Sequence, residues 1–496
     1  MVISEKLANA RRYELEESKK ISKEERPVFH MFTPIGWMND PNGFSIFNGS
    51  THLFFQYHPY STHWGPMHWG HYTTEDFIRW EPEPCALAPD MEYDKDGCFS
   101  GTALEWNGQH VLMYTAVRED ADANGEMRVR QTQAIAFGDG TNYEKYEKNP
   151  VIKADTLPEG SSPVDFRDPK IWKDENGFWS LVGSKHADGS GQLALFHSEN
   201  LLEWKFVKIL DYCNNEYGKM WECPDFFGLD GRQILIVSPQ FMMSDGKEFH
   251  NGNNSIYFVG DYDAKQQEWS RDIPHMIDFG LDFYAPQTML HPDGRRIMIG
   301  WLQNWDNYLL PDGFRWSGMM TVPRELTLRG DRLFQNPVRE LERYQTNRVF
   351  CENYELTAEA GKVEIQGIKG RCMDLTVTIL KDECKEFCIS LAVDEKHKTV
   401  IRYEKERGLL TTDRNCCGMW KDLLTERSIK LEEADMKHLQ LRILLDKYSV
   451  ELFVNDGKYA MSTLMYTPFS ADRVFFETDG TVCMDIEKFD IVVEED

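Results

Sequence analysis

Short apolar stretches separated by tight polar turns dominate the first two-thirds of the chain. One unit recurs five times: an apolar run, an Asn-Gly or Asp-Gly pair, and a second apolar run. The pairs are Asn48-Gly49, Asn107-Gly108, Asn176-Gly177, Asp230-Gly231 and Asp293-Gly294. Such a pair between apolar runs favours a β-hairpin, because both of its residues take φ > 0. Each unit is therefore predicted to be a hairpin.

The spacing of these hairpins predicts a propeller. Their turn glycines recur about every 60 residues, which is too long for one hairpin and suits a four-stranded blade with its loops. Five repeats thus predict a five-bladed β-propeller, and the strand-and-turn texture places it at residues 28–334.

The pattern changes at both ends of this region. Residues 1–27 are predicted to form a helical appendage, with a helix over residues 3–25 whose apolar stripe holds Ile3, Leu7, Ala10 and Tyr13. Residues 335–347 are polar, begin at Asn336-Pro337 and predict a short helical linker.

The last third of the chain alternates apolar and polar residues with a period of two. The clearest runs are 373–380, 387–393, 439–445 and 449–454. Several such strands within residues 348–496 predict a C-terminal β-sandwich. The fold class is therefore all-β, and exposed strand edges of the sandwich offer a place where a homo-oligomer could form.

The composition limits the classes of molecule that the protein can bind and the compartment in which it works. The net charge of −27 argues against nucleic acid and anionic membranes, which require basic surfaces. The 14 tryptophans suit either sugar binding or a β-rich core. The charged N-terminus lacks a secretory signal, no apolar run is long enough to span a membrane, and the 11 cysteines are an odd number. Together these features predict a cytoplasmic protein with free thiols.

Three of the repeats open on a carboxylate next to proline. These openings are Asp40-Pro41, Asp168-Pro169 and Glu222-Cys223-Pro224. An isolated Asp-Pro is usually an ordinary turn. Three in phase within one propeller would converge, because the first strand of each blade lines the central channel. Cleavage of a glycosidic bond needs such carboxyl groups, one as acid and one as nucleophile or base.

Two neighbouring features have competing explanations. Arg167 precedes Asp168 and either holds nearby carboxylates ionised or makes a surface ion pair. His58, His63, His68 and His71 raise the alternative of a metal site, but their spacing does not match a helical ligand pair. We therefore expect a rigid loop containing Trp64-Gly65, and no metal or cofactor.

The ordered motifs of the chain resemble glycoside hydrolase family 32, the invertases and fructan exohydrolases. The resemblance extends from about residue 28 to the C-terminus. It rests on Trp37–Gly43, Gln56–Pro59, Phe99–Gly101, Phe166–Pro169, Trp221–Asp225, Asp282–Thr288 and Thr321–Leu326. It implies the same architecture that the repeats predict, a five-bladed propeller followed by a β-sandwich.

The resemblance also implies roles for individual residues. It makes Asp40 the nucleophile, Glu222 the acid/base and Asp168 the stabiliser of the transition state. The residues that it implies as substrate contacts are Asn39, Gln56, Trp64, Phe99, Ser100, Arg167, Trp301 and Tyr284.

The implied activity is retaining hydrolysis of terminal β-D-fructofuranosides. Sucrose, sucrose 6-phosphate and short fructo-oligosaccharides are all candidate substrates. Three alternatives stay open: a fructosyltransferase on the same fold, a non-catalytic sugar-binding propeller, and an inverting glycosidase acting on pentosides.

Overall fold

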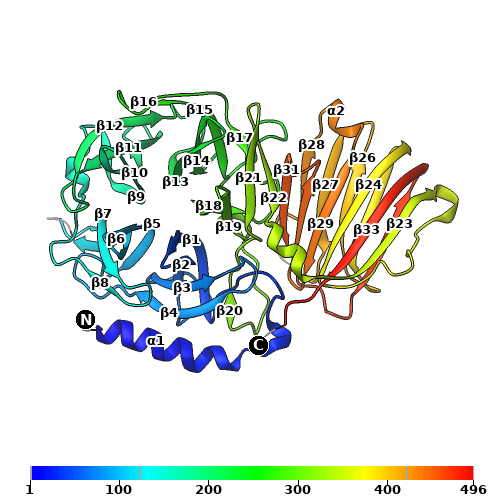
Figure 1. Ribbon diagram of the computed structural model, residues 1–496, viewed down its shortest axis with the longest axis horizontal. Helices are drawn as coiled ribbons and strands as arrows, with labels where there is room; N and C mark the ends of the chain where they lie inside the picture. The colour runs from blue at the N-terminus through cyan, green and yellow to red at the C-terminus, as the bar shows by residue number, and fades with distance from the viewer. Residues whose placement is uncertain (1–2, 122–123, 420–422, 495–496) are drawn as a thin grey trace.

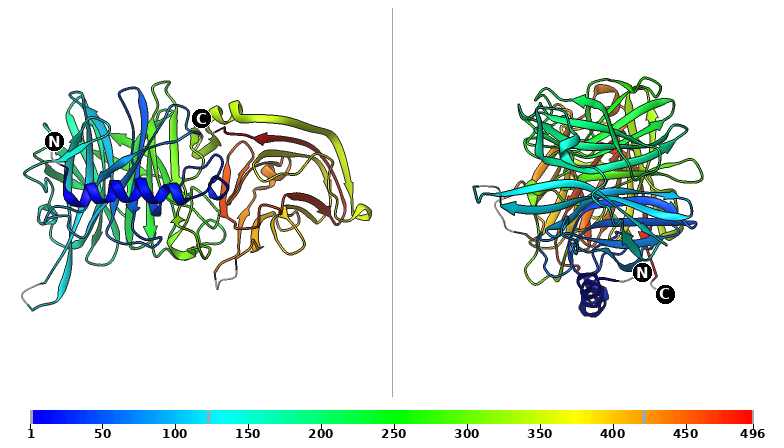
Figure 2. Two further views of the ribbon diagram at one scale, coloured as in Figure 1. Left: turned by 90° about the horizontal axis from the view of Figure 1, so that it is seen from below. Right: turned by 90° about the vertical axis from the view of Figure 1, so that its left-hand side faces the viewer.

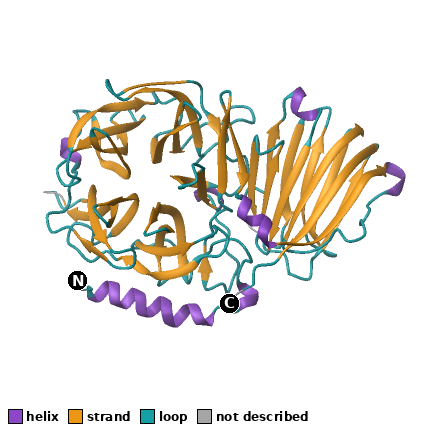
Figure 3. Cartoon of the chain, viewed as in Figure 1, coloured by secondary structure: helices purple, strands orange, loops and turns teal. Residues whose placement is uncertain are grey.

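The computed structural model describes residues 3–121, 124–419 and 423–494. A ring of blades and an elongated pair of packed sheets lie side by side (Figure 1). Strands make up most of both bodies, with a single long helix beside the ring (Figure 3). The prediction of an all-β protein with a propeller and a sandwich is confirmed.

Five antiparallel sheets form the blades. Blade I contains β1 (Gly36–Phe47), β2 (Ser50–His58), β3 (His68–Thr74) and β4 (Glu81–Leu87). Blade II contains β5 (Gly97–Trp106), β6 (Gln109–Ala121), β7 (Met127–Gly138) and β8 (Tyr143–Lys145). Blade III contains β9 (Ser161–Asp174), β10 (Gly177–His186), β11 (Gly191–Ser198) and β12 (Lys205–Tyr212).

The remaining two blades complete the ring. Blade IV contains β13 (Met220–Leu229), β14 (Arg232–Gln240), β15 (Ile256–Asp263), β16 (Glu268–Arg271) and β17 (His275–Met276). Blade V contains β18 (Tyr284–Leu290), β19 (Arg296–Trp301), β21 (Arg324–Arg329) and β22 (Arg332–Pro337). A short strand from the blade V segment, β20 (Trp316–Ser317), pairs with β1 in parallel and joins the last blade to the first.

The repeated Gly turns join the first and second strands of each blade. Both turn residues have positive φ at Asn48-Gly49, Asn107-Gly108 and Asp230-Gly231, as predicted. In the turn pairs Asn176-Gly177 of blade III and Asp293-Gly294 of blade V, only the glycine has positive φ, so these two turns are of another type. The first strands β1, β5, β9, β13 and β18 contact one another around the ring, which makes them the innermost strands.

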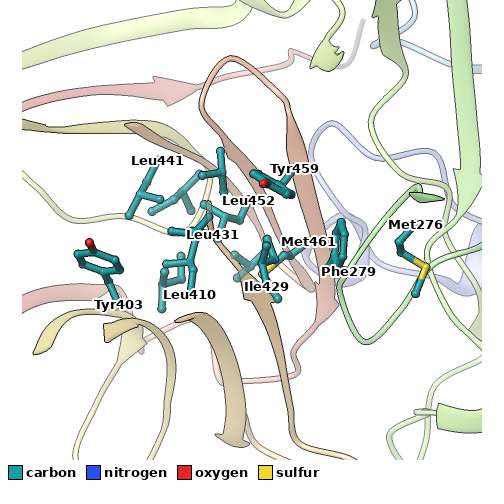
Figure 4. Close-up of a cluster of buried hydrophobic side chains, with 14 of the residues drawn as sticks. Met276, Phe279, Tyr403, Leu410, Ile429, Leu431, Leu441, Leu452, Tyr459 and Met461 are labelled. Carbon is teal, nitrogen blue, oxygen red and sulfur yellow. The ribbon is translucent and has the colours of Figure 1, made fainter. Parts of the chain in front are cut away.

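Two sheets form the sandwich. The six-stranded sheet contains β23 (Gln345–Thr357), β33 (Thr481–Ile491), β24 (Met373–Glu383), β29 (Gln440–Asp446), β30 (Ser449–Val454) and β31 (Tyr459–Leu464). The five-stranded sheet contains β28 (Glu426–Lys430), β27 (Leu409–Cys416), β26 (Lys398–Glu404), β25 (Glu386–Val393) and β32 (Arg473–Thr478). Their inward residues form one apolar core, which extends to Met276 and Phe279 of the propeller (Figure 4).

The N-terminal helix is shorter than predicted. Helix α1 (Glu5–Glu17) is capped by Ser4 and lies along the outside of the propeller (Figure 2). It buries Leu7 and Ala10, but the next position on that stripe is Glu14, and Ile3 is 43% exposed. The polar run that follows forms only the turns η1 (Ser18–Lys20) and η2 (Lys23–Glu25). In the described part of the chain, no helix is long and apolar enough to cross a membrane.

Outside the segment predicted as a linker, four other short helices occur in the described residues. They are η3 (Ala154–Thr156), η4 (Trp305–Asn307), η6 (Ala358–Ala360) and α2 (Glu433–Met436). The segment predicted as a linker holds η5 (Arg339–Tyr344), between the end of β22 and the start of β23.

Buried charges tie the propeller to the sandwich. His30 lies between Asp446 and Glu451 of the sandwich, with ring nitrogens 2.8 and 2.9 Å from their carboxylates. Arg324 of blade V also pairs with Glu451, at 2.5 Å, and all four side chains are shielded from solvent. Because buried charges are stabilised only by such partners, this network fixes how the two bodies meet.

Candidate active site

The innermost strand of every blade carries an irregularity at the same phase. The register shifts between Met38 and Pro41 in β1, Phe99 and Gly101 in β5, Arg167 and Lys170 in β9, Glu222 and Asp225 in β13, and Tyr284 and Gln287 in β18. A bulge leaves a residue outside the hydrogen-bond ladder and redirects its side chain. Proline follows in four of the five strands, where a missing N–H costs no ladder bond. The three predicted acids all lie at these bulges.

Two of these acids meet at one sulfur atom. Asp40 Oδ2 and Asp168 Oδ2 each lie 3.6 Å from Cys223 Sγ. The Ser100 hydroxyl donates to Asp40 Oδ2 at 2.7 Å, and the Cys223 N–H donates to Asp168 Oδ2 at 3.0 Å. Asp168 and Cys223 both have left-handed φ values, 67° and 48°. Strained backbone of this kind is typical of functional sites, where the surrounding structure holds it in place.

The third acid, Glu222, is held at both oxygens. Arg167 Nε donates to Oε1 at 2.8 Å, and the Tyr284 hydroxyl lies 2.7 Å from Oε2. The same hydroxyl lies 2.9 Å from the Ser238 carbonyl oxygen, which can only accept a hydrogen bond. Because a hydroxyl carries one proton, Tyr284 can donate to only one of these two oxygens at a time. The carboxyl group is only 14% exposed.

Burial and the neighbouring acids raise the pKa values of Asp168 and Asp40. Burial, and then the charge of Glu222, raise the pKa of Asp168 to about 7. Burial is also the main cause that raises the pKa of Asp40, while the Ser100 hydrogen bond lowers it. Near neutral pH the Asp168 carboxyl group is therefore partly protonated. Such a site can donate a proton while another carboxylate stays charged.

The predicted substrate contacts surround this cluster at different depths. Asn39 is 3% exposed and accepts from Trp37 Nε1 at 2.7 Å, while Gln56 is 2% exposed and donates to the Cys98 carbonyl at 3.0 Å. Trp64 is 51% exposed and contacts Phe99 edge-on. Trp301 is fully buried behind its neighbouring aromatic rings, so a ligand would reach it only through them.

Sequence reasoning missed three contributors. Cys223 was treated as the spacer between Glu222 and proline, yet it contacts both other acids. The Thr115 hydroxyl accepts the N–H of Asp168 at 2.8 Å, and Trp305 stacks on Trp37 with ring centres 5.8 Å apart. The position of Cys223 between Glu222 and proline was a usable signal, but Thr115 and Trp305 belong to a strand and a short helix whose patterns do not mark them.

The four histidines of residues 58–71 have separate partners. His58 Nδ1 lies 3.0 Å from the His63 carbonyl, and His68 Nδ1 lies 3.0 Å from that of Pro66. His71 instead pairs with His52 at 3.0 Å inside blade I. These contacts support the prediction of a rigid loop beside the site.

Asp282, the first residue of the motif Asp282–Thr288, faces the sandwich. Asp282 is fully buried and pairs with Arg414 of the sandwich. Tyr284, two residues later, begins β18, and its hydroxyl faces Glu222.

Comparison with known proteins gives consistent matches over the whole chain. The models for "Glycosyl hydrolases family 32 N-terminal domain" and "Glycosyl hydrolases family 32 C terminal" match residues 30–337 and 340–492. The sequence is 38% identical to a sucrose-6-phosphate hydrolase of Escherichia coli over 89% of each chain. It is 35% identical to a raffinose invertase of the same species, over 92% of this chain and 94% of that protein. A solved GH32 beta-fructofuranosidase of Bombyx mori superposes with a TM-score of 0.84 and 31% identity over 98% of each chain, and a mutant of it was solved with sucrose.

Proposed function

The chain belongs to glycoside hydrolase family 32 and hydrolyses fructosides, and from this premise we propose that Asp40, Glu222 and Asp168 perform a retaining double displacement. In the first step the Asp40 carboxylate attacks the anomeric carbon C2 of a terminal β-fructofuranosyl unit. Glu222 gives its proton to the departing glycosidic oxygen. In the second step Glu222 takes a proton from water, whose oxygen attacks C2 and displaces the Asp40 carboxylate, which releases fructose with its original configuration.

One observation carries this assignment: Glu222 is the acid whose two oxygens are held by an arginine and a tyrosine hydroxyl. These two contacts fix the orientation of the Glu222 carboxyl group, which supports its role as the proton donor. Asp40, held by Ser100, supplies the nucleophile, and Asp168 lies where it can accept fructosyl hydroxyl groups. Burial of all three groups strengthens each of these interactions relative to water.

Trapping the covalent intermediate tests the assignment. Glu222→Gln should slow both steps, and mass spectrometry after rapid quenching with sucrose should find a fructosyl adduct on the peptide containing Asp40. Asp165→Asn is the matched control. Asp165 lies on β9, the strand of Asp168, and contacts Arg167 from outside the cluster. An adduct on any other residue, or an Asp40→Asn variant with turnover close to wild type, would refute the assignment.

Product analysis separates hydrolysis from transfer. The wild-type protein incubated at high sucrose concentration should yield free fructose as the main product. Predominant formation of longer oligosaccharides would instead assign the site to fructosyl transfer.

We propose sucrose and sucrose 6-phosphate as the main substrates, in line with the names of the relatives. The proposed location is the cytoplasm. Cys223 supports it, because its thiol lies between two catalytic carboxylates and a reducing compartment would keep it unmodified. Pairing of subunits through the long exposed edge strand β23 is a further proposal, which light scattering of the purified protein tests.

A further inference from the structure

A cleft of about 290 Å³ lies between the propeller and the sandwich, and none of its lining residues belongs to the carboxylate cluster. One wall is the loop between β14 and β15, which contributes Ser244, Lys247 and His250. The other wall is the start of β28, with Arg427. Its apolar side includes Phe279, which packs into the core next to Ile429 of the same strand (Figure 4).

Arg427 is the unusual residue of this cleft. Its Nε is shielded from water and has no hydrogen-bond partner, and within the described residues no ion pair holds its guanidinium. Burial lowers the pKa of Arg427, and the charges of Asp306 and Asp282 oppose this effect only in part. A charge removed from water is costly unless a partner replaces the water.

The surrounding charges do not supply that partner. Glu426, the adjacent residue, is turned toward Arg402, 3.2 Å away. Arg414 on the neighbouring strand is paired with Asp282, so it has the kind of partner that Arg427 lacks. The charges of Asp306 and Asp282 also act on Arg427, but neither carboxylate forms an ion pair with it in the described part of the chain.

The loop opposite adds positive charge and hydrogen-bond donors. Lys247 lies in this loop and forms no ion pair with the described residues. Burial, and then the charge of Arg427, lower the pKa of His250 to about 4, so the two side chains lie close together. In a protein with a net charge of −27, this cleft is lined by the cations Lys247 and Arg427 and by one acid, Glu426.

The cleft and the active site share one structural connection. Asp306 of η4 accepts hydrogen bonds from the backbone and side chain of Asn253, at 2.5 and 2.7 Å, at the end of the loop that carries His250. The next residue before Asp306 is Trp305, which stacks on Trp37 beside Asn39. A ligand in the cleft therefore lies against the loop system that borders the substrate site.

We propose that this cleft binds a phosphate group, with the Arg427 guanidinium as its main anchor and Lys247 and Ser244 as further donors. The guanidinium presents parallel N–H groups that match two phosphate oxygens, and an ammonium group adds a point charge. The phosphate belongs either to a phosphorylated substrate, which rests on the proposed function, or to inorganic phosphate binding on its own.

Calorimetry with inorganic phosphate tests the site without any turnover. Wild type should bind phosphate, and Arg427→Gln should weaken binding at least 10-fold, as expected for loss of a charge-assisted hydrogen bond. Lys247→Gln should weaken it several-fold, and this variant cannot unfold the sandwich because it lies on an exposed loop. Arg407→Gln is the control, since it removes an exposed arginine paired with Glu404 on the same sheet. Absence of phosphate binding, or equal binding by all four proteins, would overturn the proposal.

Kinetics then identify the source of the phosphate. If the substrate carries it, Arg427→Gln should lower kcat/KM for sucrose 6-phosphate at least 10-fold, leave sucrose within about 2-fold, and make inorganic phosphate a competitive inhibitor of the phosphorylated substrate only. If the site takes free phosphate, both substrates should respond equally to the variant and to added phosphate. A failure of the proposed catalytic function would instead appear as lost turnover on both substrates with phosphate binding intact.

Discussion

The stability of the protein should fall steeply between pH 6.5 and pH 9 because of a single histidine. Burial alone would lower the pKa of His30, but its hydrogen bonds to Asp446 and Glu451 raise it to about 9. The ordinary value is 6.5. A raised pKa means that the folded state holds this proton after the unfolded state has released it.

The sign and size of the effect follow from these two values. The stabilisation is complete below pH 6.5, declines as pH rises, and is lost above pH 9. Each unit of pKa difference corresponds to about 1.4 kcal/mol, so protonated His30 contributes about 3 kcal/mol. This is a large part of the net stability of a typical domain.

Urea unfolding of wild type and His30→Gln measures this contribution. The variant should be less stable at pH 6, and the difference between the two proteins should shrink by about 3 kcal/mol at pH 10. His397→Gln is the control: His397 also contacts a carboxylate, Asp394, but both side chains are partly exposed, so the change should stay below about 1 kcal/mol. A difference that is equal at pH 6 and pH 10 would refute the role assigned to the His30 proton.

Three further changes have defined outcomes. Tyr284→Phe removes the hydroxyl on Glu222 and should lower kcat/KM for sucrose by about 10- to 100-fold, whereas an unchanged rate would argue against the hydrogen bond at 2.7 Å. Ser100→Ala removes a hydrogen bond that lowers the pKa of Asp40, so the acidic limb of the pH–rate profile should move to higher pH, and a limb that stays in place would contradict this. Burial raises the pKa of Glu14 from 4.5 to about 7, which costs stability above pH 7. In thermal or urea unfolding, Glu14→Gln should therefore stabilise the protein by up to about 3 kcal/mol at pH 8 and by nothing at pH 4.5.

Local patterns in the sequence were sufficient to predict the propeller. The Asn-Gly and Asp-Gly turns fall between the first and second strands of the blades, and the acids next to proline fall at the bulges of the innermost strands. These features depend on a few neighbouring residues, so they can be recognised without the fold. The assignment of separate roles to Asp40, Asp168 and Glu222 depended on the family resemblance and not on spacing.

Contacts between distant residues could not be predicted in this way. The end of α1 at Glu17 reflects how the helix lies on blade I, where Glu14 accepts the Cys85 N–H at 2.8 Å. The unpaired guanidinium of Arg427 is defined by which acids turn elsewhere, and the sequence does not contain that information. The same holds for Tyr284, whose hydroxyl reaches Glu222 from another blade.

The sandwich influences the chemistry through the backbone it holds. The segment before β18 is bonded to strand β31: the Asp282 N–H donates to the Ser462 carbonyl at 3.0 Å, and its carboxylate accepts the Leu464 N–H at 2.7 Å. Gly280 is required here, because a Cβ would lie 2.1 Å from the Ser462 oxygen. Tyr284 follows two residues after Asp282, so the position of its hydroxyl on Glu222 depends on this attachment. The sandwich thus helps to position the proton donor, because it holds the backbone that carries Tyr284.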